Sequence, residues 1–186
     1  MKRPWILLAV AFICWSNRLS ADVFATPAEV CAILTKQGVE LPLWNKLPSG
    51  GGLDEYFCGS GLQTITPSSS IKVPANNIAI YVSGKHKEYA ELIELTVNIN
   101  DNKNRDEAIK KFKITAKTLI TKFSVGVPQY FMNNIQTLKV TCALTDFGKA
   151  IIDYDRSAID SYKLSLVRAN ATVLMDEPSP PAKKCH

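Results

Sequence analysis

Histidine is the side chain most often used for proton transfer near neutral pH, and the chain contains only two. His86 lies in the charged turn Gly84-Lys85-His86-Lys87, and His186 is the final residue. A cysteine–histidine hydrolase would have to use Cys58 or Cys142 with His86, and disulfide bonding would consume either thiol. We therefore interpret His86 as a residue of a solvated turn.

Carboxylates are the second possible source of acid–base chemistry. Glu91 shares its alternation phase with Tyr89 and Ile93, so a folded strand could bury it and allow it to act as an acid or a base. The alternative, which we favour, is a frayed position at the end of a hairpin, open to water. Asp153 and Asp155 alternate on one short strand and resemble a solvent-facing edge. We predict no catalytic residue.

Metal and phosphate sites have little support. Cys185 and His186 offer two ligands at the end of the chain, whereas a structural zinc site uses four. The triplet Gly50-Gly51-Gly52 is not followed by Lys-Ser or Lys-Thr, as a phosphate-binding loop requires. The sequence therefore predicts no metal and no cofactor.

The first 21 residues have the three parts of a secretory signal peptide. Lys2 and Arg3 provide the positive start, residues 5–15 are continuously apolar, and small residues follow. We predict cleavage after Ala21, although Val23-Phe24-Ala25 has the better small-residue pattern. The apolar run is shorter than the roughly 20 residues that span a bilayer, so we predict no stable membrane anchor.

Cleavage would leave 165 residues, enough for one domain with a substantial core. We predict a single domain over residues 22–175 and a disordered tail over residues 176–186, which has three prolines and no apolar pattern. The 22 basic residues would fall to 19 against 17 acidic ones, so the net charge falls from +5 to about +2. So small a charge argues against nucleic-acid binding.

Four cysteines remain after cleavage, and an even number in an exported chain suggests two disulfides. Spacing favours a bond between Cys31 and Cys58, which would link the first helix to the first strand. Cys142 and Cys185 could form the second bond. Alternatively, because Cys142 shares its phase with Leu144, it could be a buried free thiol beneath an untethered Cys185.

The clearest pattern lies in the middle of the chain. Apolar residues alternate from Ile78 to Val82, stop at the Gly84 turn, and alternate again up to Ile99. Residues 108–123 then have helical spacing, with Asn104 and Glu107 placed as a capping box. These patterns predict a β-hairpin followed by a long amphipathic helix.

The remaining elements flank this unit. Thr26 and Glu29 form another candidate capping box, starting a helix that would end near Gly38. The other predictions are a strand over 56–66 broken at 59–61, a short helix after Pro128, and strands over 138–145, 150–155 and 160–169. Together they predict an α+β fold, in which an antiparallel sheet of about five or six strands packs on one long amphipathic helix. The N-terminal helix would be disulfide-linked to the sheet.

The chain places Cys31 on a helix, Trp44 in a loop, Tyr56-Phe57-Cys58 on a strand, and a Gly84-centred hairpin before a long helix. In this combination it resembles small exported bacterial proteins of an uncharacterised family, known only as a domain of unknown function. The resemblance covers roughly residues 26–169. It implies a periplasmic or secreted single domain and carries over no catalytic residue.

We therefore expect an exported, non-enzymatic binding protein of the bacterial cell envelope that recognises a protein partner, as an inhibitor or immunity protein does. Loops on a rigid scaffold commonly carry recognition. The predicted contact residues are Trp44, Lys85, His86 and Lys87, with the bend at 59–61 beside them. For Trp44 taken by itself, we favour the other interpretation, a loop residue packed onto the edge of the core.

Two other functions stay open. An apolar-ligand carrier would need a pocket between the long helix and the sheet, lined by Phe112, Leu119, Tyr130 and Phe131. A hydrolase would need Glu91 or the Asp153/Asp155 pair in a cleft. The exposed face of the long helix is predicted to be solvated, although it could receive an acidic partner. Its lysines are Lys110, Lys111, Lys113, Lys117 and Lys122.

Overall fold

The structure is a computed structural model that describes residues 22–35, 43–46, 55–123, 125–156, 159–171 and 185. The predicted signal peptide and its cleavage site lie outside these residues. So does the predicted disordered tail, apart from Cys185.

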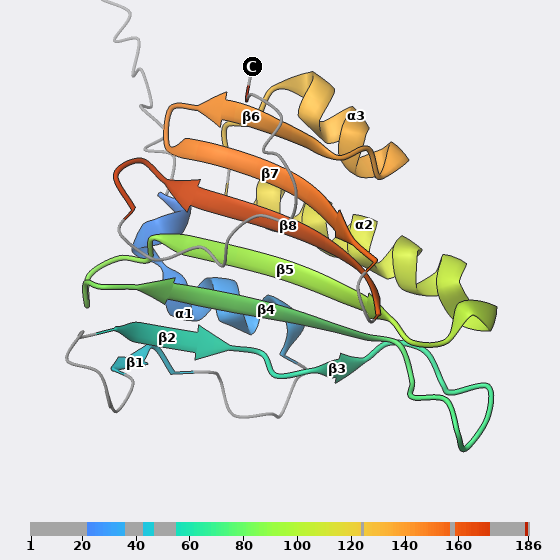
Figure 1. Ribbon diagram of the computed structural model, residues 1–186. Helices are drawn as coiled ribbons and strands as arrows, with labels where there is room; N and C mark the ends of the chain where they lie inside the picture. The colour runs from blue at the N-terminus through green and yellow to red at the C-terminus, as the bar shows by residue number, and fades with distance from the viewer. Residues whose placement is uncertain are drawn as a thin grey trace, which may run out of the picture.

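An antiparallel sheet forms the centre of the molecule (Figure 1). Its strand order is β1-β2-β4-β5-β8-β7-β6, and β3 pairs with β4 beside β2. The strands are β1 Asn45–Lys46, β2 Tyr56–Gly59, β3 Gln63–Thr64, β4 Asn77–Gly84, β5 Leu92–Ile99, β6 Thr141–Thr145, β7 Gly148–Asp155 and β8 Asp160–Arg168. The predicted α+β fold is confirmed. β1, of two residues, was not predicted, and β2 and β3 are the two parts of the strand predicted over 56–66 and broken at 59–61.

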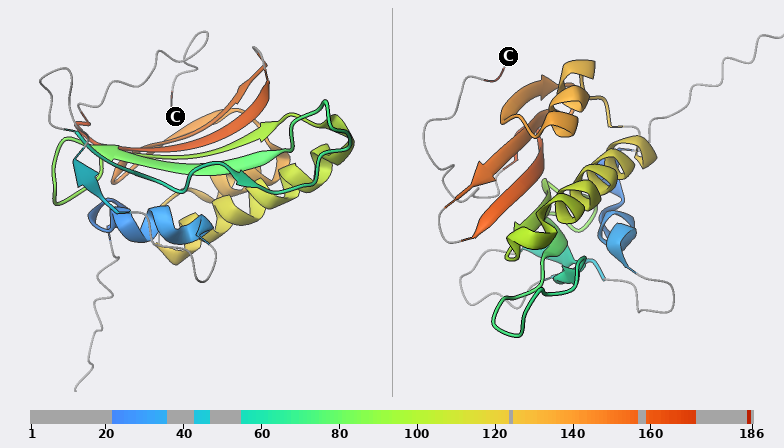
Figure 2. Two further views of the ribbon diagram at one scale, coloured as in Figure 1. Left: turned by 90° about the horizontal axis from the view of Figure 1, so that it is seen from below. Right: turned by 90° about the vertical axis from the view of Figure 1, so that its right-hand side faces the viewer.

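The helices gather on one side of this sheet, with α1 and α2 next to each other beneath it (Figure 2). Short 3₁₀ turns η1, η2 and η3 flank α1 and precede α2, and α3 contacts both α2 and β6. The bounds are η1 Val23–Ala25, α1 Pro27–Cys31, η2 Ala32–Leu34, η3 Asn102–Asn104, α2 Arg105–Lys122 and α3 Gln129–Thr137. Within the described residues, no helix is both long and apolar enough to cross a bilayer.

The core lies between α2 and the sheet, because the alternation in β4 and β5 and the helical spacing in α2 each give one apolar face. Every second residue of β5 faces the helices and is buried, and Ile93 and Leu95 are fully so. From the other side, α2 contributes Phe112 and Leu119, which are also 0 % exposed. Burying each such side chain stabilises the fold by about 1.5–3 kcal/mol. The long helix and the central hairpin are therefore held together chiefly by apolar burial.

One ladder joins two parts of the chain that are distant in sequence. β5 pairs along its whole length with β8, placing Leu95 opposite Leu164. The hairpin β4–β5 and the meander β6–β7–β8 thereby become one sheet, and α2 and α3 form the connection between them.

Both disulfides are present. Cys31 in α1 is bonded to Cys58 in β2, with Cα atoms 6.2 Å apart, which confirms the predicted link between helix and sheet. Cys142 in β6 is bonded to Cys185, so the free-thiol alternative is wrong. The strand phase behind that alternative is also reversed. Ala143 faces the core while Leu144 is 56 % exposed, because the strand starts only at Thr141.

Neither predicted capping box forms. Thr26 makes no capping hydrogen bond at the start of α1. Asp22 caps the preceding turn η1, where its side chain accepts a 3.0 Å hydrogen bond from the Phe24 amide. Asn104 does not cap α2, because the turn η3 precedes the helix. Asp101 caps this turn by accepting a hydrogen bond from the Lys103 amide.

Asp101 also fastens the polar loop 66–76 to the start of α2. Its carboxylate accepts a 2.7 Å hydrogen bond from the Ser69 amide, and its own amide donates to Asn76 Oδ1. Burial alone would raise the pKa of Asp101. The hydrogen bonds from Ser69, Lys103 and Asn104 outweigh this effect and hold that pKa below its ordinary value. The loop is thus anchored by a charged cap.

Candidate functional site

The loop between β4 and β5 folds back tightly on the end of β4. The Glu91 amide donates to the Ser83 carbonyl at 2.8 Å. A Cβ atom on Gly84 would lie 2.9 Å from the Tyr89 carbonyl oxygen and 3.0 Å from the Glu91 nitrogen. Only glycine fits this close approach of backbone to backbone. Gly84 therefore fixes the path of the loop, with His86 and Lys87 exposed at its end.

Trp44 reaches this loop from a separate part of the chain. Its indole Nε1 donates a 2.8 Å hydrogen bond to the Lys87 carbonyl, and its ring stacks on Tyr56 with the ring centres 5.9 Å apart. Trp44 is partly buried, so it packs on the sheet and also contributes to the surface. The structure thus brings together all four residues that the sequence singled out. We call Trp44, Lys85, His86 and Lys87 the hairpin tip.

His86 is less isolated than the sequence suggests. Its side chain is 50 % exposed, as expected for a turn, but its ring stacks on Tyr89 with the centres 4.6 Å apart. Its Nε2 lies 3.8 Å from Glu91 Oε1. This exceeds hydrogen-bond distance, and among the described residues no serine, threonine or cysteine side chain is hydrogen-bonded to His86. Within the described residues, His86 is therefore not paired with a nucleophile.

The prediction that Glu91 is open to water is wrong: the residue is only 4 % exposed. Its cover comes from distant segments. The Phe24 carbonyl accepts a hydrogen bond from the Ala90 amide, and the Arg168 amide donates to the Glu91 carbonyl at 2.9 Å. The Arg168 guanidinium also lies over the Tyr89 ring, 3.9 Å from its centre. The N-terminal segment and the end of β8 thus close over the base of the loop.

Asp153 and Asp155 are far from Glu91. Glu91 lies beside the end of β8 at Arg168, whereas Asp155 pairs with Ser161 near the beginning of that strand. Seven residues of extended strand separate these positions, or roughly 23 Å. The described structure therefore does not join Glu91 and Asp155 in one cleft. The bend at 59–61 also lies away from the tip, because Gly59 pairs with Tyr81 further along β4.

The pocket expected for an apolar ligand is filled. Phe112, Leu119 and Phe131 are each fully buried in the core, while Tyr130 is 43 % exposed. A groove of about 540 Å³ does lie where α2 faces η2 and β3, but other side chains line it, including Glu107 and Lys111. The four predicted residues therefore do not form a common cavity.

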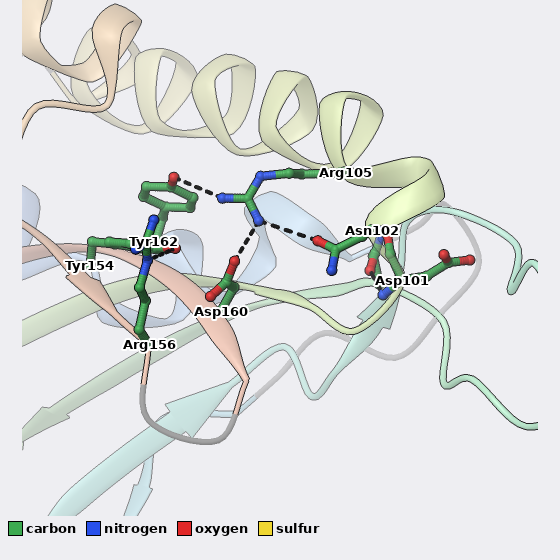
Figure 3. Close-up of polar contacts among 8 residues, drawn as sticks. Asp101, Asn102, Arg105, Tyr154, Arg156, Asp160 and Tyr162 are labelled. Carbon is green, nitrogen blue, oxygen red and sulfur yellow. Dashed lines mark hydrogen bonds and ion pairs between the residues drawn. The ribbon is translucent and has the colours of Figure 1, made fainter.

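A second polar cluster, which the sequence did not reveal, lies at the opposite end of β8 (Figure 3). Arg105, the first residue of α2, donates from Nη1 to Asp160 Oδ2 at 2.6 Å and from Nη2 to the Tyr162 hydroxyl at 3.1 Å. The Tyr162 ring stacks on Tyr154, with centres 4.5 Å apart, and Arg156 donates to the Tyr154 hydroxyl. This cluster ties the start of the long helix to the β7–β8 turn.

The Arg105–Asp160 pair makes stability depend on pH. The hydrogen bond from Arg105 lowers the pKa of Asp160 below its ordinary 3.8, so the ionised pair stabilises the fold above that value. We expect Asp160→Asn to lower the free energy of unfolding at pH 7. The difference from the unchanged protein should shrink as the pH falls through the lowered pKa. Denaturant unfolding at a series of pH values from 7 to about 2 measures both quantities.

The control for this pair is Arg105→Gln, which removes the cation that lowers the pKa of Asp160. In that background, Asp160→Asn should change stability much less at pH 7. If Asp160→Asn lowers the free energy of unfolding equally with Arg105 and with Gln at position 105, the two residues are not energetically coupled.

Metal ligands do not cluster in the described part of the chain, where no group of three or more His, Cys, Asp or Glu side chains could hold an ion. Cys185 has its sulfur in a disulfide, and His186 lies outside the described residues.

Comparison of the chain with models of protein families, with curated proteins and with solved structures gave no match. The resemblance to an uncharacterised exported family stays a prediction, based on the residues named above.

Proposed function

We propose that this chain is an exported, non-enzymatic binding protein that recognises a protein partner through the hairpin tip. The observation that carries the proposal is the hydrogen bond from Trp44 Nε1 to the Lys87 carbonyl. It combines a large aromatic side chain from one loop with the cationic turn of another. Tryptophan is among the residues that contribute most to protein–protein binding energy.

The chemistry of the tip indicates which partner it suits. His86 and Lys87 are exposed, Lys85 is half-buried, and the Trp44 ring lies against the sheet beside them. An apolar ring next to lysines suits a partner surface that presents an apolar side chain near carboxylates. The tight loop at Gly84 holds the tip in place before binding, which reduces the entropy lost on association.

The proposed location rests on the cysteines. Two disulfides favour an oxidising compartment. Together with the signal-like first 21 residues, they support export to the periplasm or beyond the cell, and an inhibitor or immunity protein of the bacterial envelope is the functional class we propose.

The test is capture followed by a measured affinity. The disulfide-bonded protein is immobilised, incubated with envelope extract, and the retained protein is identified and purified. Trp44→Ala is expected to weaken its binding about tenfold or more, because it removes both the ring and the donor to Lys87. Trp44→Phe, which can still stack on Tyr56 but cannot donate, should give an intermediate loss.

Ile71→Ala is the matched control. Ile71 is a fully exposed apolar residue in the loop 66–76, so its loss should leave the affinity unchanged. Thermal unfolding of each variant shows that the fold is intact. The proposal is wrong if no partner is retained, or if the retained partner binds the Trp44→Ala and unchanged proteins equally.

A further inference from the structure

A groove of about 500 Å³ runs between α2 and α3, on the helical side of the molecule. Lys113, Ile114 and Lys117 line it from α2, and Gln129, Met132 and Gln136 are among the α3 residues that line it. Its lining contains two cations and no carboxylate. The groove is separate from the hairpin tip, since no tip residue lines it.

Ile114 gives this groove an apolar floor. The core side of α2 is formed by residues such as Phe112 and Leu119, yet Ile114 points away from them and is 53 % exposed. Met132 of α3 lies in the same groove and is only partly buried. Exposed isoleucine beside methionine, bordered by polar groups, is a surface suited to an apolar anchor from another molecule.

The walls of the groove differ in their chemistry. Lys113 and Lys117 are one helical turn apart and lie on the same face of α2. Across the groove, α3 presents amide side chains, and Gln129 Nε2 donates to Asn133 Oδ1 at 3.2 Å. One wall therefore attracts carboxylates, while the other offers uncharged donors and acceptors.

We propose that this α2–α3 groove binds an acidic amphipathic helix of another protein. The apolar side chains of that helix would lie on Ile114 and Met132, and its carboxylates would face Lys113 and Lys117. Helices commonly bind in grooves through anchors one turn apart, and two lysines without an opposing carboxylate make the groove complementary to an acidic segment. The inference does not depend on the hairpin tip.

The test is an NMR titration of the ¹⁵N-labelled, disulfide-bonded protein with a synthetic peptide. The peptide has about 14 residues, with leucines at i, i+4, i+7 and i+11 and glutamates on its other faces. We expect the shifted amide signals to come from residues 113–117 and 129–136. Binding should weaken when salt is raised from about 0.05 M to 0.5 M, because the ion pairs are exposed.

Two charge variants test the site itself. Lys113→Glu combined with Lys117→Glu is expected to weaken peptide binding about tenfold or more. Lys72→Glu combined with Lys149→Glu changes the net charge equally at exposed positions outside the groove and should have little effect. Equal weakening by the two double variants would show general charge attraction and overturn the proposal.

The apolar floor needs its own comparison. Ile114→Ala should weaken the amphipathic peptide while leaving the weaker binding of polyglutamate unchanged. The proposal fails if the peptide shifts no signals in the groove, if polyglutamate binds as tightly as the peptide, or if a peptide with lysine in place of glutamate binds equally well. None of these results would affect the hairpin tip, whose test uses a different surface.

Discussion

Replacing both Cys31 and Cys58 by alanine is expected to lower the free energy of unfolding by about 3.5 kcal/mol, and the melting temperature by about 10 °C. The bond closes a loop of 27 residues, and removing it returns that freedom to the unfolded chain. Both cysteines are also almost fully buried, so packing at the α1–β2 contact is lost as well. Denaturant unfolding under non-reducing conditions measures the change.

The matched variant removes the other bond by replacing Cys142 and Cys185. That bond spans 43 residues, so loop closure alone predicts a similar loss, about 4 kcal/mol. Cys142 is only half-buried on a strand at the sheet edge, however, so little packing is lost there. Hydrogen exchange should show earlier opening of residues 27–34 in the Cys31/Cys58 variant alone. A loss below about 1 kcal/mol in that variant would contradict the expectation.

The second large effect is expected for Gly148→Ala, which should cost about 3 kcal/mol or more. Gly148 begins β7 with a φ of +143°, where residues with a side chain are strained. Its added Cβ would lie 2.1 Å from the Val167 carbonyl oxygen and 2.5 Å from the Ala169 nitrogen. Because these are backbone atoms of β8 and its end, relief requires separating the two strands. Chemical denaturation gives the magnitude.

Gly126→Ala is the control for this substitution. An added Cβ there has no neighbour within 4 Å, and Gly126 has no positive φ. The free energy of unfolding of the Gly126→Ala variant should stay within about 0.5 kcal/mol of that of the unchanged protein. Gly61→Ala separates the strain of a positive φ from the steric clash of an added Cβ. Gly61 has a φ of +63° but also open space around it. If Gly148→Ala costs no more than Gly61→Ala, the clash with β8 is unimportant.

Local patterns were sufficient to predict most of the sheet and its long helix. Alternation in β4 and β5 and helical spacing in α2 depend on neighbouring residues, which the sequence shows directly. The bond between Cys31 and Cys58 was favoured by cysteine spacing, which placed one cysteine on the first helix and the other on the first strand. The strand at Cys142 was assigned the wrong phase because Leu138, which was counted as part of it, adopts a left-handed conformation at the end of α3.

What the sequence could not show are contacts between distant segments. Glu91 is buried where Phe24, far before it in the chain, is hydrogen-bonded to Ala90, and Arg168, far after it, to Glu91 itself. The position of Arg105 beside Asp160 depends on where α2 begins relative to β8. Tyr154 and Tyr162 could have been recognised as a pair, since they flank one turn and share the phase of the core residues. No local pattern indicated that Arg105, from the start of α2, would join this tyrosine pair.

The hydrogen bonding of β8 between β5 and β7 has a consequence for the order in which the protein folds. The hairpin β4–β5 can form early, but one long edge of it has no partner until residues 160–168 have been synthesised. Closing contacts between such distant segments is slow, because much chain entropy is lost before the contacts form. The native sheet is therefore completed only after β8 has been synthesised. Under the export that we propose, such late completion would keep the chain unfolded long enough to be threaded through a translocation channel.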